Sequence, residues 1–235
     1  MIEFYQSKWF DIDLCNVDEN LNIKKLPDHS FYYKFYSILL ERHSSYEQVK
    51  QHVLSCNQPA IKYLTDVISS KGYKNILSIG SGIGFIEYEL AKNNPHVNFY
   101  ANDFNIESYF LLGAASLDNI KLSSTLMKNV NYDLIYLNNV DYALSNQHYD
   151  DLLQQIRGLS NNGIVLSTVV FKEDLKIYSI IKNIFLKYFD RKSIFWGYIR
   201  SKKEHNQIIK NAGYKINNKI LKKHHNILIM SEELK

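Results

Sequence analysis

The chain has 235 residues, 46% of them apolar, and a formal net charge of +4. This length suits one domain with a smaller appended part, and we expect a helical cap in residues 1–60 and the main domain in residues 61–235. No apolar run approaches the roughly eighteen residues of a membrane span, and no signal-peptide pattern opens the chain. Two cysteines are too few for a disulfide framework and favour a cytoplasmic protein, and no Cys/His cluster has metal-site spacing.

The N-terminal part is expected to be irregular first and helical afterwards. Residues 1–30 are polar, with scattered aromatic side chains, and could form a lid or lie loosely. Apolar residues then recur at helical spacing in residues 30–43, in residues 46–54 and again from Pro59 to a stop at Gly72. Two or three helices therefore precede the first predicted strand of the main domain.

The most informative stretch is Lys74 to Phe104. A short apolar run leads into Gly80-Ser81-Gly82-Ile83-Gly84, a helical pattern follows, and a second apolar run, 97–101, ends before Asp103. Glycines permit the tight turn and let a cofactor lie against the backbone, while N–H groups at the helix start favour electron-rich groups. Asp103 lies about twenty residues further on, where a carboxylate can accept hydrogen bonds from both ribose hydroxyls. The layout predicts a nucleotide-cofactor site.

The rest of the chain alternates strands and helices. A helix carrying Ile106 to Leu117, a weak strand near residues 120–122, a buried strand over 132–137, a helix over 149–156 and a strand over 164–171 follow in order. This alternation predicts an α/β fold with a mostly parallel, Rossmann-like sheet and helices on both faces.

Three features are expected near the C-terminus. The amphipathic segment 175–189 should be a helix whose Tyr178, Ile181, Phe185 and Tyr188 face inward. Residues 195–200 should form a loop, and Ser201 with Glu204 should form a capping box for a helix ending at Gly213. Two late strands, 215–221 and 226–230, should form a hairpin.

The glycine spacing distinguishes between two kinds of cofactor. A dinucleotide fingerprint would need its closing glycine at Phe85, whereas Gly-x-Gly-x-Gly resembles motif I of the class I S-adenosylmethionine (SAM) methyltransferases. The resemblance runs from about Ile61 to the C-terminus and implies a seven-stranded sheet whose last strand is antiparallel. It departs at Ser78, where the family often has an acid that helps to hold the methionine end of SAM. The residues that it places at the cofactor are Ser78, Ile79, Gly80, Ser81, Gly82, Gly84, Asp103, Phe104, Ser123, Asn138 and Asn139.

Methyl transfer requires alignment of the acceptor with the S–CH₃ bond and exclusion of water, and an alcohol acceptor must also lose its proton. His148 and Asp141, after the fourth strand, are the candidate bases. His148 could equally be an exposed residue of a helix start, and Asp141 could cap a turn. No metal is expected in this reaction.

Aromatic and basic residues suggest an acceptor pocket. Stacking on a sugar and pairing with an anion would suit the 195–200 segment and the N-terminal helices. The residues concerned are Tyr32, Tyr36, Arg42, Tyr142, Trp196, Tyr198 and Arg200. Residues 31–53 also bear a short resemblance to the region before the SAM domain in some methyltransferases of surface-polysaccharide assembly, with Arg42 among the matching positions and His43 and Ser44 departing.

These observations predict a SAM-dependent methyltransferase that O-methylates a sugar or glycan intermediate. The alternatives are an O- or N-methyltransferase of another small molecule, and a SAM-fold subunit without catalysis. Basic residues concentrated over 182–210 favour either a solvated face or an anionic acceptor. No basic and aromatic element is typical of nucleic-acid binding.

Overall fold

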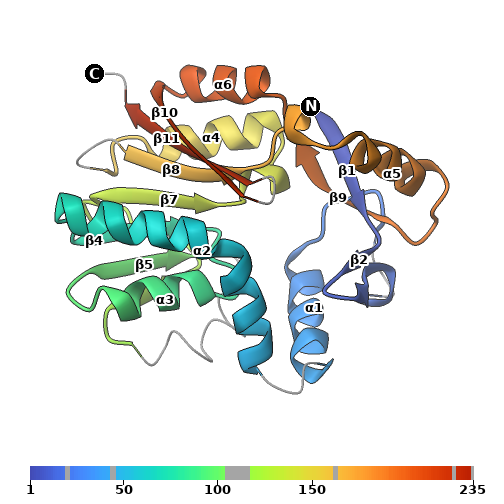
Figure 1. Cartoon of the computed structure of the whole chain (residues 1–235), viewed down its shortest axis with the longest axis horizontal. Helices are drawn as coiled ribbons and strands as arrows, with labels where there is room; N and C mark the ends of the chain where they lie inside the picture. Colours follow the sequence, from blue (N-terminus) through green and yellow to red (C-terminus); the bar gives the residue numbers. More distant parts are fainter. Residues whose placement is uncertain (19–21, 43–45, 104–116, 161–163, 224–225, 234–235) are drawn as a thin grey trace.

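A computed structural model describes residues 1–18, 22–42, 46–103, 117–160, 164–223 and 226–233, and it confirms the predicted parallel α/β arrangement. Five strands are paired in parallel in the order β8-β7-β4-β5-β6, and β8 is continued by the antiparallel strands β11 and β10 (Figure 1). Their bounds are β4 Asn75–Ile79, β5 Asn98–Asn102, β6 Ile120–Ser123, β7 Leu134–Asn138, β8 Ile164–Val169, β10 Tyr214–Lys223 and β11 Asn226–Glu233.

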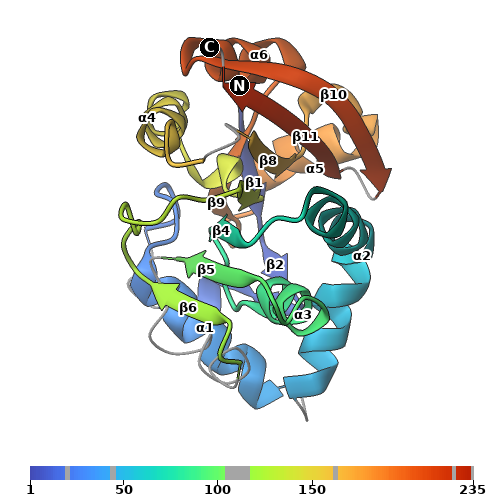
Figure 2. The ribbon, with the colours of Figure 1, turned by 90° about the vertical axis from the view of Figure 1, so that its left-hand side faces the viewer.

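Helices cover both faces of this sheet, as the sequence predicted. Strand β4 alternates, so Ile76 packs towards α2 (Tyr46–Lys71) and α3 (Phe85–Asn93), while Leu77 packs towards α4 (Asn146–Ile156) and α6 (Lys202–Asn211). Two buried apolar clusters result, one on each face, and Figure 2 shows the sheet lying between these helices. The expected capping box of α6, with Ser201 at the N-cap and Glu204, is present.

The helices before the sheet differ from the prediction. Helix α1 spans His29–Arg42, and the two segments expected at 46–54 and from Pro59 form the single helix α2. Proline cannot donate a backbone hydrogen bond inside a helix and favours a bend, and Figure 1 shows α2 changing direction along its length. Helix α2 also crosses residue 60, the expected domain boundary, so the cap and the sheet share one helix.

Two segments that were expected to lack regular structure pair with each other. Strand β1 (Ile2–Gln6) lies antiparallel to β9 (Ile194–Ile199), with a register shift between Phe4 and Tyr5. The expectations of an irregular N-terminus and of a loop at 195–200 are therefore wrong. The sequence of β9, Ile-Phe-Trp-Gly-Tyr-Ile, is rich in residues that favour strands once a partner is available. The short strands β2 (Lys8–Trp9) and β3 (Ile12–Asp13) follow β1.

The helix predicted over 175–189 forms, but with the opposite orientation. Helix α5 spans Ile177–Tyr188, and the residues expected to face inward, Tyr178, Ile181, Phe185 and Tyr188, are all exposed. Its buried residues are Asn183 and Leu186. The helical period was visible in the sequence, but the side that packs was not, because eight of the twelve positions in α5 are apolar.

Within the described ranges, no helix is both long enough and apolar enough to span a bilayer. The predicted helix that includes Ile106, together with Phe104, lies outside the described residues.

Candidate functional site

The glycine loop joins the carboxyl ends of β4 and β5. The N–H groups of Gly80 and Ser81 donate to the Asn102 carbonyl oxygen at 2.8 and 3.3 Å. Gly80, Gly82 and Gly84 have φ angles of 73°, 55° and 76°, a region that residues with a Cβ rarely adopt. A Cβ on Gly80 would lie 2.2 Å from Val140 Cγ2, so the close approach also requires glycine there. The positive φ angles and the close approach of Val140 both explain why this turn needs glycine.

Asp103 lies directly against the loop. Its Oδ2 accepts a 2.7 Å hydrogen bond from the Gly82 N–H group, and its own N–H donates to the Ser123 carbonyl oxygen at 3.3 Å. Asp103 is buried. Backbone groups hold its carboxylate at the edge of the sheet where ligands of open α/β folds bind. The structure thus brings the Asp103 carboxylate against the glycine loop, and its role in binding a ribose stays a prediction.

A second carboxylate, which the sequence interpretation missed, contacts Ser78, two residues before the loop. Glu87, in the first turn of α3, reaches back to Ser78, whose hydroxyl donates to Glu87 Oε1 at 2.6 Å. Glu87 is 1% exposed, and its Oε2 has no hydrogen-bond partner among the described residues. Burial raises the pKa of Glu87 from 4.5 to about 7, and the charge of the neighbouring Asp103 adds to the rise. The hydrogen bond from Ser78 opposes it. A carboxylate therefore exists where Ser78 seemed to leave none.

Glu87 could have been found from the sequence. An acid three residues after the last glycine, inside a helix turn that should face the sheet, is unusual, because a buried charge is costly without a partner. The loop itself contains another buried oxygen, Ser81 Oγ, for which the described part of the chain offers no hydrogen-bond partner. Unsatisfied polar atoms next to a glycine turn fit the polar groups of an adenosyl amino-acid cofactor.

The N-terminal cap covers this loop. Ile83 and Phe85 belong to the same buried cluster as Phe31, Phe35 and the other inward residues of α1. Tyr36 is closest to the loop, because its hydroxyl would lie 3.5 Å from a Cβ on Gly82. Burial raises the pKa of Tyr36, and the carboxylate of Asp103 adds to the rise. Helix α1 therefore lies next to the loop.

Three of the predicted acceptor residues meet beside Tyr36. The rings of Tyr32 and Trp196 are 6.1 Å apart, and those of Tyr32 and Tyr36 are 6.3 Å apart. The hydroxyls of Tyr32 and Tyr142 share a hydrogen bond, and burial raises the pKa of both. Strand β9 approaches η4 (Asp141–Ala143) so closely that a Cβ on Gly197 would lie 2.3 Å from the Tyr142 carbonyl oxygen. Aromatic side chains from α1, η4 and β9 thus form one wall.

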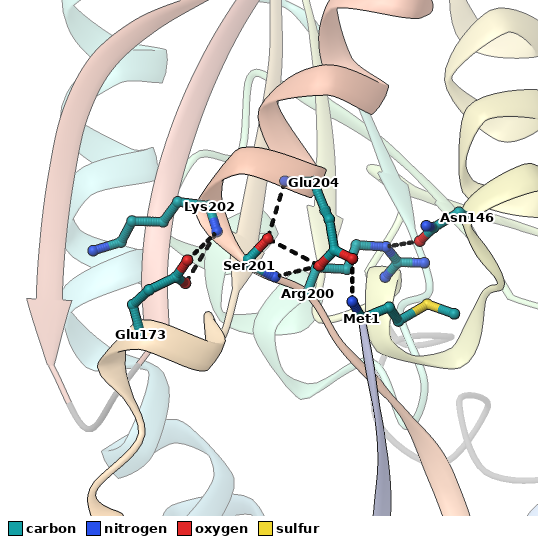
Figure 3. A network of polar contacts seen from close by, with 7 residues as sticks. All are labelled: Met1, Asn146, Glu173, Arg200, Ser201, Lys202 and Glu204. Carbon is teal, nitrogen blue, oxygen red and sulfur yellow. Dashed lines mark hydrogen bonds and ion pairs between the residues drawn. The ribbon is translucent and has the colours of Figure 1, made fainter.

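Arg200 does not join this wall as expected. The residue is 0% exposed, and its guanidinium donates to the carbonyl oxygens of Asp141 and Leu144, both at 2.5 Å. It also donates to Asn146 Oδ1 at 2.9 Å (Figure 3). These donors already bind protein atoms, so the expected role in binding an anionic acceptor is corrected to a structural one. Arg200 fastens η4 and the start of α4 to the end of β9.

The two candidate bases lie in different surroundings. Asp141 is buried, with Oδ2 3.6 Å from Arg200 Nη1; burial raises its pKa from 3.8 to about 7, and the guanidinium opposes that rise. His148 is exposed in the first turn of α4, where its backbone N–H donates to the N-cap Ser145 hydroxyl at 3.2 Å. The structure thus places His148 at a helix start.

The remaining predicted residues come from several elements. The Ser123 hydroxyl is 2.6 Å from the Thr125 carbonyl oxygen, within its own turn, and Arg42, exposed at the end of α1, donates to the Asp11 carbonyl oxygen at 3.3 Å. The Tyr198 ring packs on Phe195, with the ring centroids 5.1 Å apart. Ile79 ends β4, Asn138 ends β7, and Asn139 follows with a φ of 51°. No group of three or more His, Cys, Asp or Glu that could hold a metal occurs among the described residues.

Comparisons with known proteins agree with this architecture. No protein-family model matches the sequence, and no curated protein is similar to it. Among solved structures, the chain is similar to a protein of Nostoc punctiforme assigned to the O-methyltransferases, with a TM-score of 0.62, 15% identity, and coverage of 88% of this chain and 61% of that one. Human N-acetylserotonin methyltransferase in complex with SAM gives a TM-score of 0.60 and 15% identity, covering 88% of this chain and 56% of that one.

A shorter neighbour matches over most of its own length. Magnesium protoporphyrin IX methyltransferase of Synechocystis, with bound S-adenosylhomocysteine (SAH), gives a TM-score of 0.58 at 11% identity, covering 82% of this chain and 89% of that one. The chain spans about three-fifths of the length of the other two neighbours. At these identities the likeness shows the fold, and this fold is that of SAM-dependent methyltransferases, as the glycine motif predicted.

Proposed function

We propose that this protein is a SAM-dependent methyltransferase that acts on a small-molecule acceptor. The observation that carries the proposal is a glycine loop accompanied by two buried carboxylates, Asp103, which binds the Gly82 N–H group, and Glu87, which binds the Ser78 hydroxyl. The neighbours' fold supports it, and so does the parallel strand order β8-β7-β4-β5-β6. A bound SAM supplies a methyl group on a positively charged sulfur.

The residues of the cofactor side have separable tasks in this proposal. Gly80, Ser81, Gly82 and Gly84 provide a surface without bulky side chains, and Asp103 accepts hydrogen bonds from the ribose hydroxyls. Asp103 holds the Gly82 N–H group at 2.7 Å, so the carboxylate is oriented before a ligand arrives. Orientation in advance reduces the entropy lost on binding.

Glu87 completes the cofactor side. We propose that its Oε2, which has no hydrogen-bond partner within the described ranges, accepts a hydrogen bond from the α-ammonium group of the methionine part, the task that an acid at position 78 would have. The Ser78 hydroxyl orients the carboxylate through Oε1. An ammonium group would satisfy the buried carboxylate and favour its ionised form.

The acceptor side lies under α1. Tyr32, Tyr36 and Tyr142 present hydroxyls and ring faces next to the glycine loop, and Trp196 supports them. Walls of this kind exclude water from a methyl transfer and stack on flat or apolar acceptors. The neighbours are named for N-acetylserotonin and magnesium protoporphyrin IX, which are small molecules. They favour a small acceptor in general, and the sugar acceptor stays a prediction of the sequence.

Two candidates remain for removing the acceptor's proton. Asp141 already interacts with Arg200, whereas His148 has no such ion pair among the described contacts and is open to solvent. If His148 is the base, His148→Ala should lower turnover by roughly 10²- to 10⁴-fold and leave SAH affinity unchanged. A decrease in turnover of less than about fivefold would exclude His148 as the base and make Asp141→Asn the next test.

The proposed activity can be tested with SAM carrying a labelled methyl group. The protein is incubated with a panel of small phenols, amines and free or nucleotide-linked sugars, and label transfer is followed together with SAH release. Transfer to one acceptor class, abolished by Asp103→Ala, is expected. SAH binding without transfer to any acceptor would favour the catalytically inactive subunit, and the absence of SAH binding would overturn the proposal.

A further inference from the structure

Helix α5 exposes an apolar face where a surface helix ordinarily exposes polar residues. Six side chains at helical spacing share this face, with exposed fractions from 49% for Ile184 to 77% for Ile177. They are Ile177, Tyr178, Ile181, Ile184, Phe185 and Tyr188. Phe189, the residue that ends the helix, is 72% exposed and extends the same face. A continuous exposed patch of this kind marks an interaction site more often than scattered apolar residues do.

The orientation of α5 is fixed by specific contacts on its opposite side. Asn183 accepts a hydrogen bond from the Tyr5 N–H group at 2.8 Å and donates to the Glu3 carbonyl oxygen at 2.9 Å. Lys187 forms a 2.7 Å ion pair with Glu3, and Leu186 is buried. Figure 1 shows α5 on the outside of the β1 and β9 pair, at the edge of the molecule. The apolar face is therefore held outward.

Basic residues surround the apolar face. Lys176, Lys182, Arg191 and Lys192 are exposed on α5 or its ends, and no acidic residue occurs between Leu175 and Phe189. The neighbouring acids are already engaged. Glu173 accepts from the Lys202 N–H group (Figure 3), Asp174 pairs with the Lys202 ammonium at 3.4 Å, and Asp190 accepts from the Lys192 N–H group at 2.9 Å. The rim of the apolar face therefore carries positive charge.

We propose that the α5 face binds the surface of an anionic membrane, with its apolar side chains in the acyl boundary and its basic residues among the headgroups. Charge decides between this occupant and a second copy of the chain. Two copies joined through α5 would bring two basic rims together, whereas anionic lipid complements them.

The chemistry of the individual side chains fits an interfacial helix. Isoleucine and phenylalanine contribute apolar area, tyrosine rings favour the headgroup level, and lysine stems can lie along the apolar surface while the ammonium groups reach the headgroups. Such binding is peripheral and requires no membrane-spanning helix. It also does not depend on the methyl-transfer chemistry proposed above.

Vesicle flotation of the full chain tests the proposal. Vesicles of phosphatidylcholine alone are compared with vesicles that contain roughly a third phosphatidylglycerol, at about 0.1 M and about 0.5 M NaCl. We expect binding to the anionic vesicles that weakens with salt. Ile181→Ser combined with Phe185→Ser should reduce binding more than about tenfold, and Arg191→Glu combined with Lys192→Glu should reduce it about tenfold or more.

Tyr33→Ser, which removes an exposed aromatic residue from α1, is the matched control and should bind vesicles like the unaltered protein. All substituted positions are exposed, and thermal unfolding followed by circular dichroism confirms that each variant folds. Equal binding to both vesicle types would contradict the proposal that the α5 face prefers an anionic membrane surface. Failure to bind either vesicle, together with a dimer that Ile181→Ser and Phe185→Ser dissociate in light scattering, would assign the face to a second copy and overturn the proposal.

Discussion

The two sides of the candidate site are constructed differently. The cofactor side comes from one stretch, Gly80 to Asp103, in which a glycine turn and two carboxylates lie close in sequence. The acceptor side joins α1, η4 and β9, which are far apart in the chain and meet through aromatic packing. The comparison indicates that the cofactor side is set by local backbone geometry, whereas the acceptor side depends on tertiary contacts.

The acceptor side depends on Arg200. Arg200→Ala should lower the free energy of unfolding by about 3–5 kcal/mol, because it leaves the buried Asp141 and two carbonyl oxygens without their donor. Urea unfolding measures the change, and Arg191→Ala, at an exposed position, should change it by no more than about 0.5 kcal/mol. If the variant has unaltered stability and a raised KM for the acceptor, Arg200 binds the acceptor and the structural role is wrong.

Substitution of one glycine on each side distinguishes the cofactor side from the acceptor side. Gly80→Ala and Gly197→Ala should each cost about 2–4 kcal/mol of unfolding free energy, because each Cβ meets an atom at 2.2 or 2.3 Å in a backbone region that favours glycine. Only Gly80→Ala should weaken SAH binding by the folded protein. Gly158→Ala, with a φ of 79° and open space around its Cβ, is the control and should cost about 1 kcal/mol. Equal losses of SAH affinity in both variants would abolish the distinction between the sides.

Asp103 is expected to contribute to the affinity for the cofactor. Asp103→Ala should weaken SAH binding by about 1–3 kcal/mol, since the ribose hydroxyls lose a charged acceptor. The control is Asp133→Ala, because Asp133 also accepts backbone hydrogen bonds, from Lys74 and Asn75, at the start of β4. Calorimetry of both variants should show a loss only for Asp103, and unchanged affinity there would mean that this carboxylate does not bind the cofactor.

Glu87 gives a smaller and more selective effect. Glu87→Gln should weaken SAH binding by about 1–2 kcal/mol and leave 5′-methylthioadenosine, which lacks the amino-acid part, unaffected. Calorimetric titration of both compounds separates the outcomes. Equal weakening of the two would assign Glu87 a structural role, whereas failure of the unaltered protein to bind either compound would reject the cofactor proposal itself.

The same residue predicts a pH dependence. The pKa of Glu87 is raised from 4.5 to about 7, so between these values the folded protein binds more protons than the unfolded chain, and the free energy of unfolding should fall as pH rises. Asp141, raised from 3.8 to about 7, acts in the same direction. Urea unfolding from pH 4.5 to 7 measures the slope, which Glu87→Gln should reduce. An unchanged slope would contradict the burial of an ionisable Glu87.

The sequence predicted the local features of the site and missed the distant ones. The glycine turn and Asp103 could be placed because strand, turn and helix follow one another within thirty residues or so. Glu87 was missed because the motif places the acid at position 78, whereas the carboxylate that reaches Ser78 comes from the next helix. The pairing of β1 with β9 and the outward face of α5 could not be predicted, since both depend on which partner a strand or an apolar helix meets.

The most direct test of the central claim is calorimetric titration of the unaltered protein with SAH and, separately, with NAD. The glycine loop accompanied by Asp103 and Glu87 predicts SAH binding in the micromolar range and no comparable heat with NAD, because Phe85 stands where a dinucleotide site needs its closing glycine. Tight NAD binding without SAH binding would contradict the account.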